Sequence, residues 1–314
     1  MNGPHHVPVM MKEVLDLLPL RPGATMVDGT LGLAGHSLEI CRRISPGGLL
    51  IATDWDKEML RMARTRLEEV QGVELSLHHA DYRSLPQVLA RTLAEKGRRS
   101  GADGVLLDLG LNNAQIEDPS RGISFKEVGP LDMRMDSSQG KPLSELLAKM
   151  SASEIEEVLF ELGDERWAKR ISQVIVDRRK QKPLLTTTDL VECILAAVPL
   201  NMRDKRLHPA TRSFMALRIY VNDELEGLEE CLVDAGHLLA KHGVMVVLSY
   251  HSGEDRAAKM AVRRLVAEGG YECLTKKPLV PGEEEVARNP KSRSAKLRAV
   301  RRKDMEDTDG HRAF

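Results

Sequence analysis

The chain has 314 residues, 42% of them hydrophobic, which is enough to bury one or two ordinary cores. Its 46 basic and 47 acidic residues give a formal net charge of −1, which argues against a general binder of polyanions but allows local basic patches. Aromatic residues make up only 3% of the chain, so we do not expect bases to stack on it along a whole nucleic-acid strand.

No apolar run approaches the roughly 20 residues that a membrane span needs. Residues 1–8 lack the basic and apolar regions of a secretory signal. The four cysteines are scattered without metal-like spacing, and no other metal ligand set stands out. We therefore expect a cytoplasmic protein with reduced thiols, without a membrane segment and without a metal centre.

Apolar runs rich in strand-forming residues, bounded by turn residues, predict strands. In chain order they lie at 25–30, 49–53, 73–78, 105–109 and 244–250. Helical patterns lie between several of them, as in the segment 59–70, where apolar residues recur at helical spacing. Strands that alternate with helices indicate an α/β fold whose parallel sheet is covered on both faces.

The alternation stops in the middle of the chain. From about 116 to 214 we find helical segments and no convincing strand; one helix is predicted to start at the capping box Ser151-x-x-Glu154 and to stop at Gly163. The sequence therefore predicts an inserted all-helical domain at 116–215, within a discontinuous α/β domain formed by 1–115 and 216–314.

Residues 27–36, VDGTLGLAGH, follow the first predicted strand as a glycine-rich loop, and Asp54 ends the second strand. This arrangement is typical of α/β sheets that hold a ribose-carrying cofactor at the carboxyl ends of their strands. Asp28, and the lack of a spare basic residue for a pyrophosphate, favour S-adenosylmethionine over a dinucleotide. The glycines alone are weak evidence, because they also mark ordinary turns.

Asp54 is a candidate to accept the ribose hydroxyl hydrogens, although it could instead cap the following helix. Tyr82, after the third strand, could flank an adenine or simply fill the core. Asp108 ends the fourth strand, where a carboxylate could accept an N–H of a target amine and free the nitrogen lone pair for methylation. Asn112 and Asn113 could supply further acceptors, or could simply form a turn.

Three further segments carry polar and charged residues that are candidates to contact the substrate. Arg134 stands between two acids, which could bind substrate or form a structural ion-pair cluster. His251 could be a base or a hydrogen-bonding prop. Basic residues without an intervening acid predict a phosphate-binding surface, the alternative being a solvated face. They are Arg288, Lys291, Arg293, Lys296, Arg298, Arg301, Arg302 and Lys303, with a weaker patch at Arg203, Lys205, Arg206 and Arg212.

Together these residues resemble the RsmH (MraW) family of rRNA cytosine-N4 methyltransferases. Besides the glycine loop, the resemblance rests on HVPVM at 6–10, LDLG at 107–110, RG at 121–122, PLDMRMD at 130–136, ALRIYVNDEL at 216–225, HSGEDR at 251–256 and NPKSRSAKLR at 289–298. It covers essentially the whole chain, and long motifs in the same order are far more specific than one glycine loop.

The resemblance implies a class I (Rossmann-like) methyltransferase sheet with an inserted helical substrate domain. The implied reaction is methyl transfer from S-adenosylmethionine to N4 of a cytidine in the decoding centre of 16S rRNA, with the 30S subunit as the expected partner. The oligomeric state, monomer or homodimer, stays open. The implied cofactor contacts are Ala34, Gly35, His36, Asp54, Tyr82, Asp108 and Gln115. Asp108, Asn112 and Asn113 would hold the amine. The expected rRNA contacts are Arg134, His251, Ser252, Asp255, Arg256, Asn289, Arg293, Ser294 and Lys296.

The sequence departs from the family pattern mainly around the expected cleft. Leu33-Ala34 replaces two glycines, Asn112-Asn113 a serine pair, Met215 a glutamine, Tyr250 a phenylalanine and Gly253 a leucine. Two alternatives therefore stay open: methylation of a different nucleobase amine, and a ribosome-assembly factor that binds the cofactor without transfer. A nicotinamide dehydrogenase is the alternative at the level of the fold.

Overall fold

The computed structural model describes residues 8–98, 100–204 and 207–304. The chain forms two compact units, one made of 1–110 and 227–314 and the other of 111–226. The boundary expected at 215/216 falls inside the continuous helix α10 (Ala210–Asn222), so the second unit extends beyond that helix.

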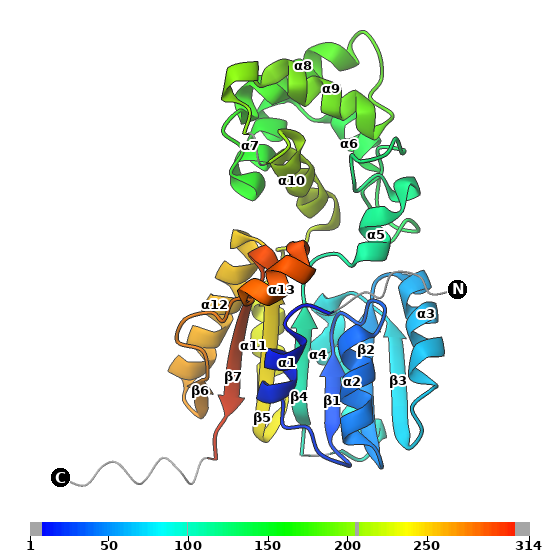
Figure 1. Cartoon of the computed structure of the whole chain (residues 1–314), viewed down its shortest axis with the longest axis vertical. Helices are drawn as coiled ribbons and strands as arrows, with labels where there is room; N and C mark the ends of the chain where they lie inside the picture. The colour runs from blue at the N-terminus through cyan, green and yellow to red at the C-terminus, as the bar shows by residue number, and fades with distance from the viewer. Residues whose placement is uncertain (1–7, 99, 205–206, 305–314) are drawn as a thin grey trace, which may run out of the picture. The chain divides into compact units, whose positions relative to one another are not determined.

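The first unit is built on a seven-stranded sheet (Figure 1). Its strands are β1 (Thr25–Asp28), β2 (Gly48–Asp54), β3 (Val73–His79), β4 (Ala102–Asp108), β5 (Leu239–Ser249), β6 (Tyr271–Cys273) and β7 (Lys296–Arg302). Their order is β3-β2-β1-β4-β5-β7-β6, with β7 antiparallel to both of its neighbours. The strand order reverses between β1 and β4, and ligands of such sheets bind beyond the carboxyl ends at this point.

All five predicted strands exist, and β6 and β7 are additional. The basic segment 296–302 was interpreted as a surface, but its apolar residues Leu297, Ala299 and Val300 are buried in β7. Arg298 is also buried, and its guanidinium donates to Asp255 at 2.7 Å. For Arg298 the expectation of an exposed phosphate-binding surface was wrong, because this residue is buried in a paired strand. For the other basic residues of the stretch it stays a prediction.

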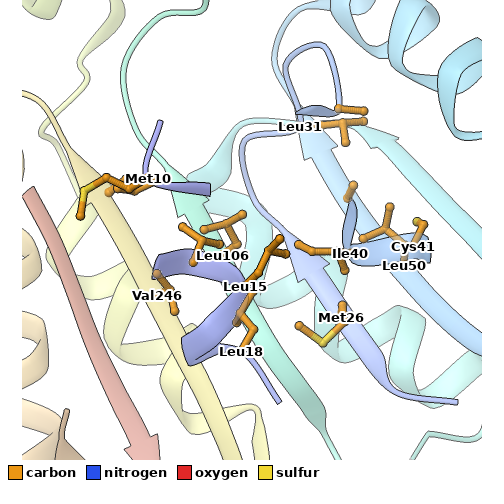
Figure 2. Packing of buried hydrophobic residues seen from close by; sticks show 14 of the residues in the cluster. Met10, Leu15, Leu18, Met26, Leu31, Ile40, Cys41, Leu50, Leu106 and Val246 are labelled. Atoms are coloured by element: carbon orange, nitrogen blue, oxygen red, sulfur yellow. The ribbon is translucent and has the colours of Figure 1, made fainter. Parts of the chain in front are cut away.

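The sheet is covered by helices because its central strands are apolar on both faces. These helices are α1 (Met11–Leu17), α2 (Gly35–Ile44), α3 (Lys57–Leu67), α4 (Leu85–Glu95), α11 (Leu228–His237), α12 (Ser252–Glu268) and α13 (Glu283–Arg288). Figure 2 shows Leu15 and Leu18 of α1 and Ile40 of α2 beside Leu106 and other strand residues. On the opposite face, α11 packs against α4 and α12.

The second unit is helical, and its described residues contain no strand. Its helices are α5 (Asn113–Glu117), α6 (Leu143–Lys149), α7 (Ala152–Gly163), α8 (Ala168–Arg179), α9 (Thr187–Ala197) and α10. The predicted capping box of Ser151 and Glu154 begins α7, and Gly163 ends it. A core of aliphatic residues such as Ile155, Leu190 and Leu217 joins α7, α9 and α10. The predicted α/β sheet with a helical insertion is therefore confirmed.

Among the residues that the structure describes, no helix is both long and apolar enough to cross a bilayer.

Candidate active site

The glycine loop is braced by Asp28 at the end of β1. One oxygen of Asp28 accepts the backbone N–H of Thr30 (3.1 Å), and the other accepts the hydroxyl of Ser37 in α2 (2.6 Å). The side chain is buried, and burial raises the pKa of Asp28 despite these two hydrogen bonds. Asp28 therefore joins the strand, the loop and the following helix, and we assign it a structural role.

The loop requires left-handed backbone at Ala34. This residue has φ of 58° and is fully buried at the start of α2, in a conformation that costs a non-glycine residue about 1 kcal/mol. Gly35 cannot carry a side chain, because a Cβ there would lie 2.5 Å from Cγ of Pro8. The carbonyl of Leu33 accepts a guanidinium N–H of Arg66 at 2.5 Å, which fixes the outer part of the loop.

Asp54 contacts the loop rather than capping a helix. Its Oδ2 accepts the backbone N–H of Gly32 (2.6 Å), and its Oδ1 accepts that of Asp56 (2.8 Å). Asp56 is the residue that caps α3, accepting the N–H groups of Glu58 and Met59. Burial raises the pKa of Asp54 to about 6, so the charged form is available at neutral pH.

An aromatic pair lies next to Asp54. The rings of Trp55 and Tyr82 have centroids 5.4 Å apart and are tilted by 47°. Tyr82 is buried, as the core-filling alternative expects, whereas Trp55 is half-buried and has Arg83 near its ring face. Trp55 is not among the residues predicted from the sequence, although its position directly after the acid that ends β2 was an available signal.

Asp108 ends β4 as predicted and has two different neighbours. Its Oδ1 accepts the hydroxyl of Tyr250 at 2.6 Å, and its Oδ2 lies 3.5 Å from Nδ1 of His36. Its backbone N–H donates to the hydroxyl oxygen of Thr30, which ties β4 to the glycine loop. Burial raises the pKa of Asp108 to about 7, and the hydrogen bond from Tyr250 acts in the opposite direction.

His36 is held in a defined tautomer. Its Nε2 lies 3.0 Å from the carbonyl oxygen of Val9, which can only accept, so Nε2 carries the proton. Burial lowers the pKa of His36, so the ring is neutral and Nδ1 has a free lone pair directed toward Asp108. Four predicted cofactor contacts, Gly35, His36, Asp54 and Asp108, are thus joined to one loop by short contacts within the first unit.

Asn112, Asn113 and Gln115 lie in the second unit. Asn112 and Gln115 form a capping box: the N–H of Gln115 donates to Oδ1 of Asn112 (3.0 Å), and the N–H of Asn112 donates to Oε1 of Gln115 (3.2 Å). Asn112 is the N-cap residue of α5, so for this residue the structure supports a conformational role, which was the alternative to holding the amine. The roles proposed for these three residues toward the cofactor and the amine stay predictions.

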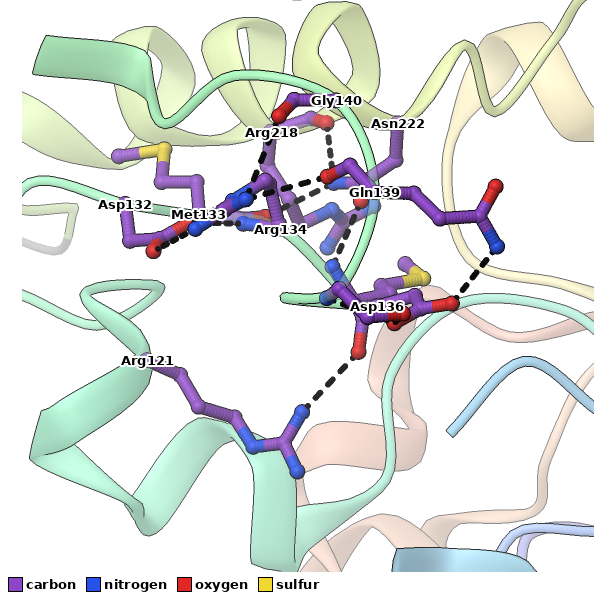
Figure 3. A network of polar contacts seen from close by, with 11 residues as sticks. Arg121, Asp132, Met133, Arg134, Asp136, Gln139, Gly140, Arg218 and Asn222 are labelled. Atoms are coloured by element: carbon purple, nitrogen blue, oxygen red, sulfur yellow. Dashed lines mark hydrogen bonds and ion pairs between the residues drawn. The ribbon is translucent and has the colours of Figure 1, made fainter. Parts of the chain in front are cut away.

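Arg134 belongs to a polar network inside the second unit (Figure 3). Its Nε and Nη2 donate to the two oxygens of Asp132 at 2.7 and 2.8 Å, and its Nη1 donates to the carbonyls of Gln139 and Gly140. Asn222 joins the same network through the backbone of the Leu131–Asp136 stretch. Arg134 thus takes part in a structural ion pair with Asp132, as the alternative interpretation expects. A contact of this residue with rRNA stays a prediction.

The segment after β5 divides into structural and exposed residues. His251 begins α12, with its Nε2 at 3.3 Å from Glu254, whose other oxygen accepts the N–H of Tyr250 at 2.7 Å. Asp255 accepts from Arg298 and, at 3.0 Å, from Lys296. The side chains of Ser252 and Arg256 are exposed on the first turn of α12. The role of His251, base or prop, stays a prediction. Asp255 and Lys296, both predicted to contact rRNA, pair with each other.

The remaining basic residues have mixed surroundings. Arg293 and Ser294 are exposed, and Asn289 precedes them at the start of the short helix Pro290–Ser294. Arg301 pairs with Glu272, and Arg203 donates to the carbonyls that end α9. The continuous patches expected from the sequence are thus partly neutralised. His6 and Val7 of the first motif, and Lys205 and Arg206 of the weaker patch, lie outside the described residues.

Comparisons with known proteins find relatives over almost the whole chain. The model of the MraW methylase family matches residues 3–303. The ribosomal RNA small subunit methyltransferase H of Koribacter versatilis (strain Ellin345) is 43% identical over 305 residues, covering 95% of this chain and 94% of the relative. The protein of the same name from Acidobacterium capsulatum is 43% identical over 309 residues, covering 96% of this chain and 100% of the relative.

Among solved structures, an rRNA methylase from Streptococcus thermophilus aligns with a TM-score of 0.39 and 9% sequence identity over 94% of each chain. The family assignment rests on the sequence matches, which extend over almost the entire length and include both units. The chain belongs to the MraW methylase family.

Proposed function

We propose that this chain transfers the methyl group of S-adenosylmethionine to the exocyclic N4 amine of a cytidine in the decoding centre of 16S rRNA. The proposal is supported by membership of the methylase family and by relatives named for the small-subunit rRNA. The observation that carries it is Asp108, a carboxylate at the end of β4 with one oxygen next to the neutral His36. The rRNA would be met in the 30S subunit, in the cytoplasm.

The residues of the first unit fit the cofactor. Each oxygen of Asp54 accepts one backbone N–H, and a carboxylate oxygen can accept a second hydrogen bond, so both can still accept a ribose hydroxyl. Trp55 and Tyr82 offer aromatic surface next to this acid for an adenine. The N-terminus of α2 and the glycine loop supply backbone N–H groups for polar parts of the ligand.

When bound, S-adenosylmethionine supplies a methyl group on a sulfonium, which an amine lone pair can displace in line. The N4 amine of cytidine is conjugated to its ring and is therefore a poor nucleophile. Asp108 would accept one N–H of this amine at Oδ2, which localises the nitrogen lone pair and orients it. Because the pKa of Asp108 is about 7, the same oxygen can take the proton that the nitrogen loses after methylation and then release it.

The target base must leave its stack to reach an acid at the edge of the sheet. We propose that exposed cations, among them Arg256 and Arg293, bind rRNA phosphates and that the shape of the rRNA specifies the nucleotide. We propose that Asn112 and Asn113 assist Asp108 in holding the amine.

The test uses isotopically labelled S-adenosylmethionine and 30S subunits from cells that lack the modification, followed by nucleoside digestion and mass spectrometry. Label in N4-methylcytidine supports the proposal, and Asp108→Ala should abolish the label while the protein stays folded. Label in another nucleoside would reassign the target. Tight cofactor binding without any label would favour an assembly factor.

A further inference from the structure

Tyr250 joins the end of β5 to the acid at the end of β4. Its hydroxyl donates to Oδ1 of Asp108 at 2.6 Å, a short distance typical of a hydrogen bond to a charged acceptor. The two strands are parallel neighbours, with Asp108 in register with Leu248. The backbone of Tyr250 is fixed as well, because its N–H donates to Glu254 at 2.7 Å.

We propose that Tyr250 is a positioning residue for Asp108, whose hydroxyl occupies Oδ1 and so leaves Oδ2 as the oxygen offered to the target amine. This inference rests on the function proposed above and deepens it. A free carboxylate can exchange its two oxygens by rotation, and a fixed phenol donor removes this freedom. The amine would then meet one oxygen in one orientation, which is a requirement for an aligned displacement.

The surroundings of Oδ2 agree with this division of roles. Its neighbour is Nδ1 of His36 at 3.5 Å, and this nitrogen has no proton to donate, because Nε2 donates to Val9. Among the residues of the first unit that the structure describes, none therefore offers a strong donor to Oδ2. An amine N–H of the substrate would supply the donor that this oxygen lacks.

Tyr250 also affects the charge of Asp108. Burial raises the pKa of Asp108, and the phenol hydrogen bond limits that rise because it stabilises the charged form. The other titratable groups that face the pair are Asp28 from β1, His36 from α2, Glu254 from α12 and Glu285 from α13. The pKa of Tyr250 lies well above its usual value, so its hydroxyl stays a donor at every working pH.

Tyr250→Phe removes the hydroxyl and keeps the ring. We expect the acidic limb of the pH–rate profile of single-turnover methyl transfer to move to higher pH by about one unit. The rate at pH 6.5 should fall about three- to tenfold and approach that of the original enzyme at pH 9. Tyr271→Phe is the matched control, since it removes a phenol that donates to the carbonyl of Gly236 at 3.1 Å within the same unit.

A second readout does not depend on transfer. The carboxyl carbon of Asp108, labelled with ¹³C and assigned with Asp108→Asn, should titrate at higher pH in Tyr250→Phe than in the original protein or in Tyr271→Phe. Identical titrations and identical pH–rate profiles would overturn the inference. If the original protein methylates no rRNA, the proposed function fails, but a shifted carboxyl titration would still show that Tyr250 controls Asp108. Thermal unfolding of each variant verifies that it is folded.

Discussion

The backbone N–H of Gly32 donates to Oδ2 of Asp54 across 2.6 Å, so a hydrogen bond joins the glycine loop directly to the acid that ends β2. The N–H of Asp56 holds the second oxygen of Asp54, so the carboxylate is fixed in place. A movement of the loop would therefore break its hydrogen bond to Asp54. The charge of Asp54 therefore affects both the shape of the loop and the capacity of the carboxylate to accept ribose hydroxyls.

Cofactor affinity should consequently depend on pH through Asp54. Its pKa is raised to about 6 by burial, so the acid is charged above this pH and protonated below it. Protonation removes an acceptor, and we expect the Kd for S-adenosylmethionine to rise as pH falls through 6, approaching tenfold per unit at lower pH. Calorimetric titration between pH 8 and 5 measures this dependence. Asp54→Asn should bind weakly with little pH dependence, and a constant Kd for the original protein would contradict the prediction.

The left-handed backbone at Ala34 predicts a steep dependence on side-chain shape. Ala34→Val places a β-branched residue at φ of 58° in a fully buried position, and we expect it to lower the free energy of unfolding by about 2 kcal/mol or more. Ala34→Gly should stay within about 1 kcal/mol, because relief of the backbone offsets the lost methyl and the greater chain entropy. Urea unfolding and cofactor titration distinguish the two variants. Equal stability of both would argue against a left-handed residue 34.

Asp108 should decrease the stability of the fold at neutral pH. Its folded pKa of about 7 lies above its ordinary value of 3.8, so the folded state binds the proton more tightly than the unfolded chain. The contribution of Asp108 to the free energy of unfolding is therefore fully present below its ordinary pKa and is lost as pH rises from about 4 to about 7.

Asp108→Asn should then be more stable than the original protein at pH 8, by about 1–3 kcal/mol after allowance for a side chain that is 23% exposed, and inactive in transfer. Near pH 4 the two proteins should differ little. Unfolding by urea at both pH values tests this, with Asp16→Asn, an exposed carboxylate of α1, as the control. A less stable Asp108→Asn at pH 8 would contradict the raised pKa of Asp108 in the folded protein.

Much of the fold follows from local sequence patterns. The strands β1 to β5 are apolar runs between turn residues, and the capping box at Ser151 needs only two residues three positions apart. Asp54 and Asp108 could be placed at one sheet edge because both directly follow such runs. These predictions depend only on residues that are close together in the sequence.

The remainder depends on contacts between distant segments. β7 looked like a basic surface because the partner of Arg298, Asp255, lies on another element far along the chain. The contact of Tyr250 with Asp108 depends on the pairing of β4 with β5, which no local pattern specifies. Trp55 was missed because its significance comes from Tyr82, which follows a different strand.

The pair of Asp255 and Arg298 predicts how structural and rRNA-binding charges can be separated. Arg298 is 8% exposed, so Asp255→Ala would leave a buried guanidinium without its carboxylate and should cost about 3 kcal/mol or more of stability. Arg256→Ala, at the neighbouring exposed position on α12, should change stability by no more than about 0.5 kcal/mol. If Arg256 binds a phosphate, its loss should weaken binding to 30S subunits and reduce the slope of log Kd against log salt by about one. Both variants are measured by urea unfolding and by salt-dependent binding. If Asp255 is structural and Arg256 binds rRNA, Asp255→Ala loses more stability, whereas Arg256→Ala loses more of the salt slope. A stable Asp255→Ala with a reduced salt slope would instead return the residue to the rRNA interface that the sequence first suggested.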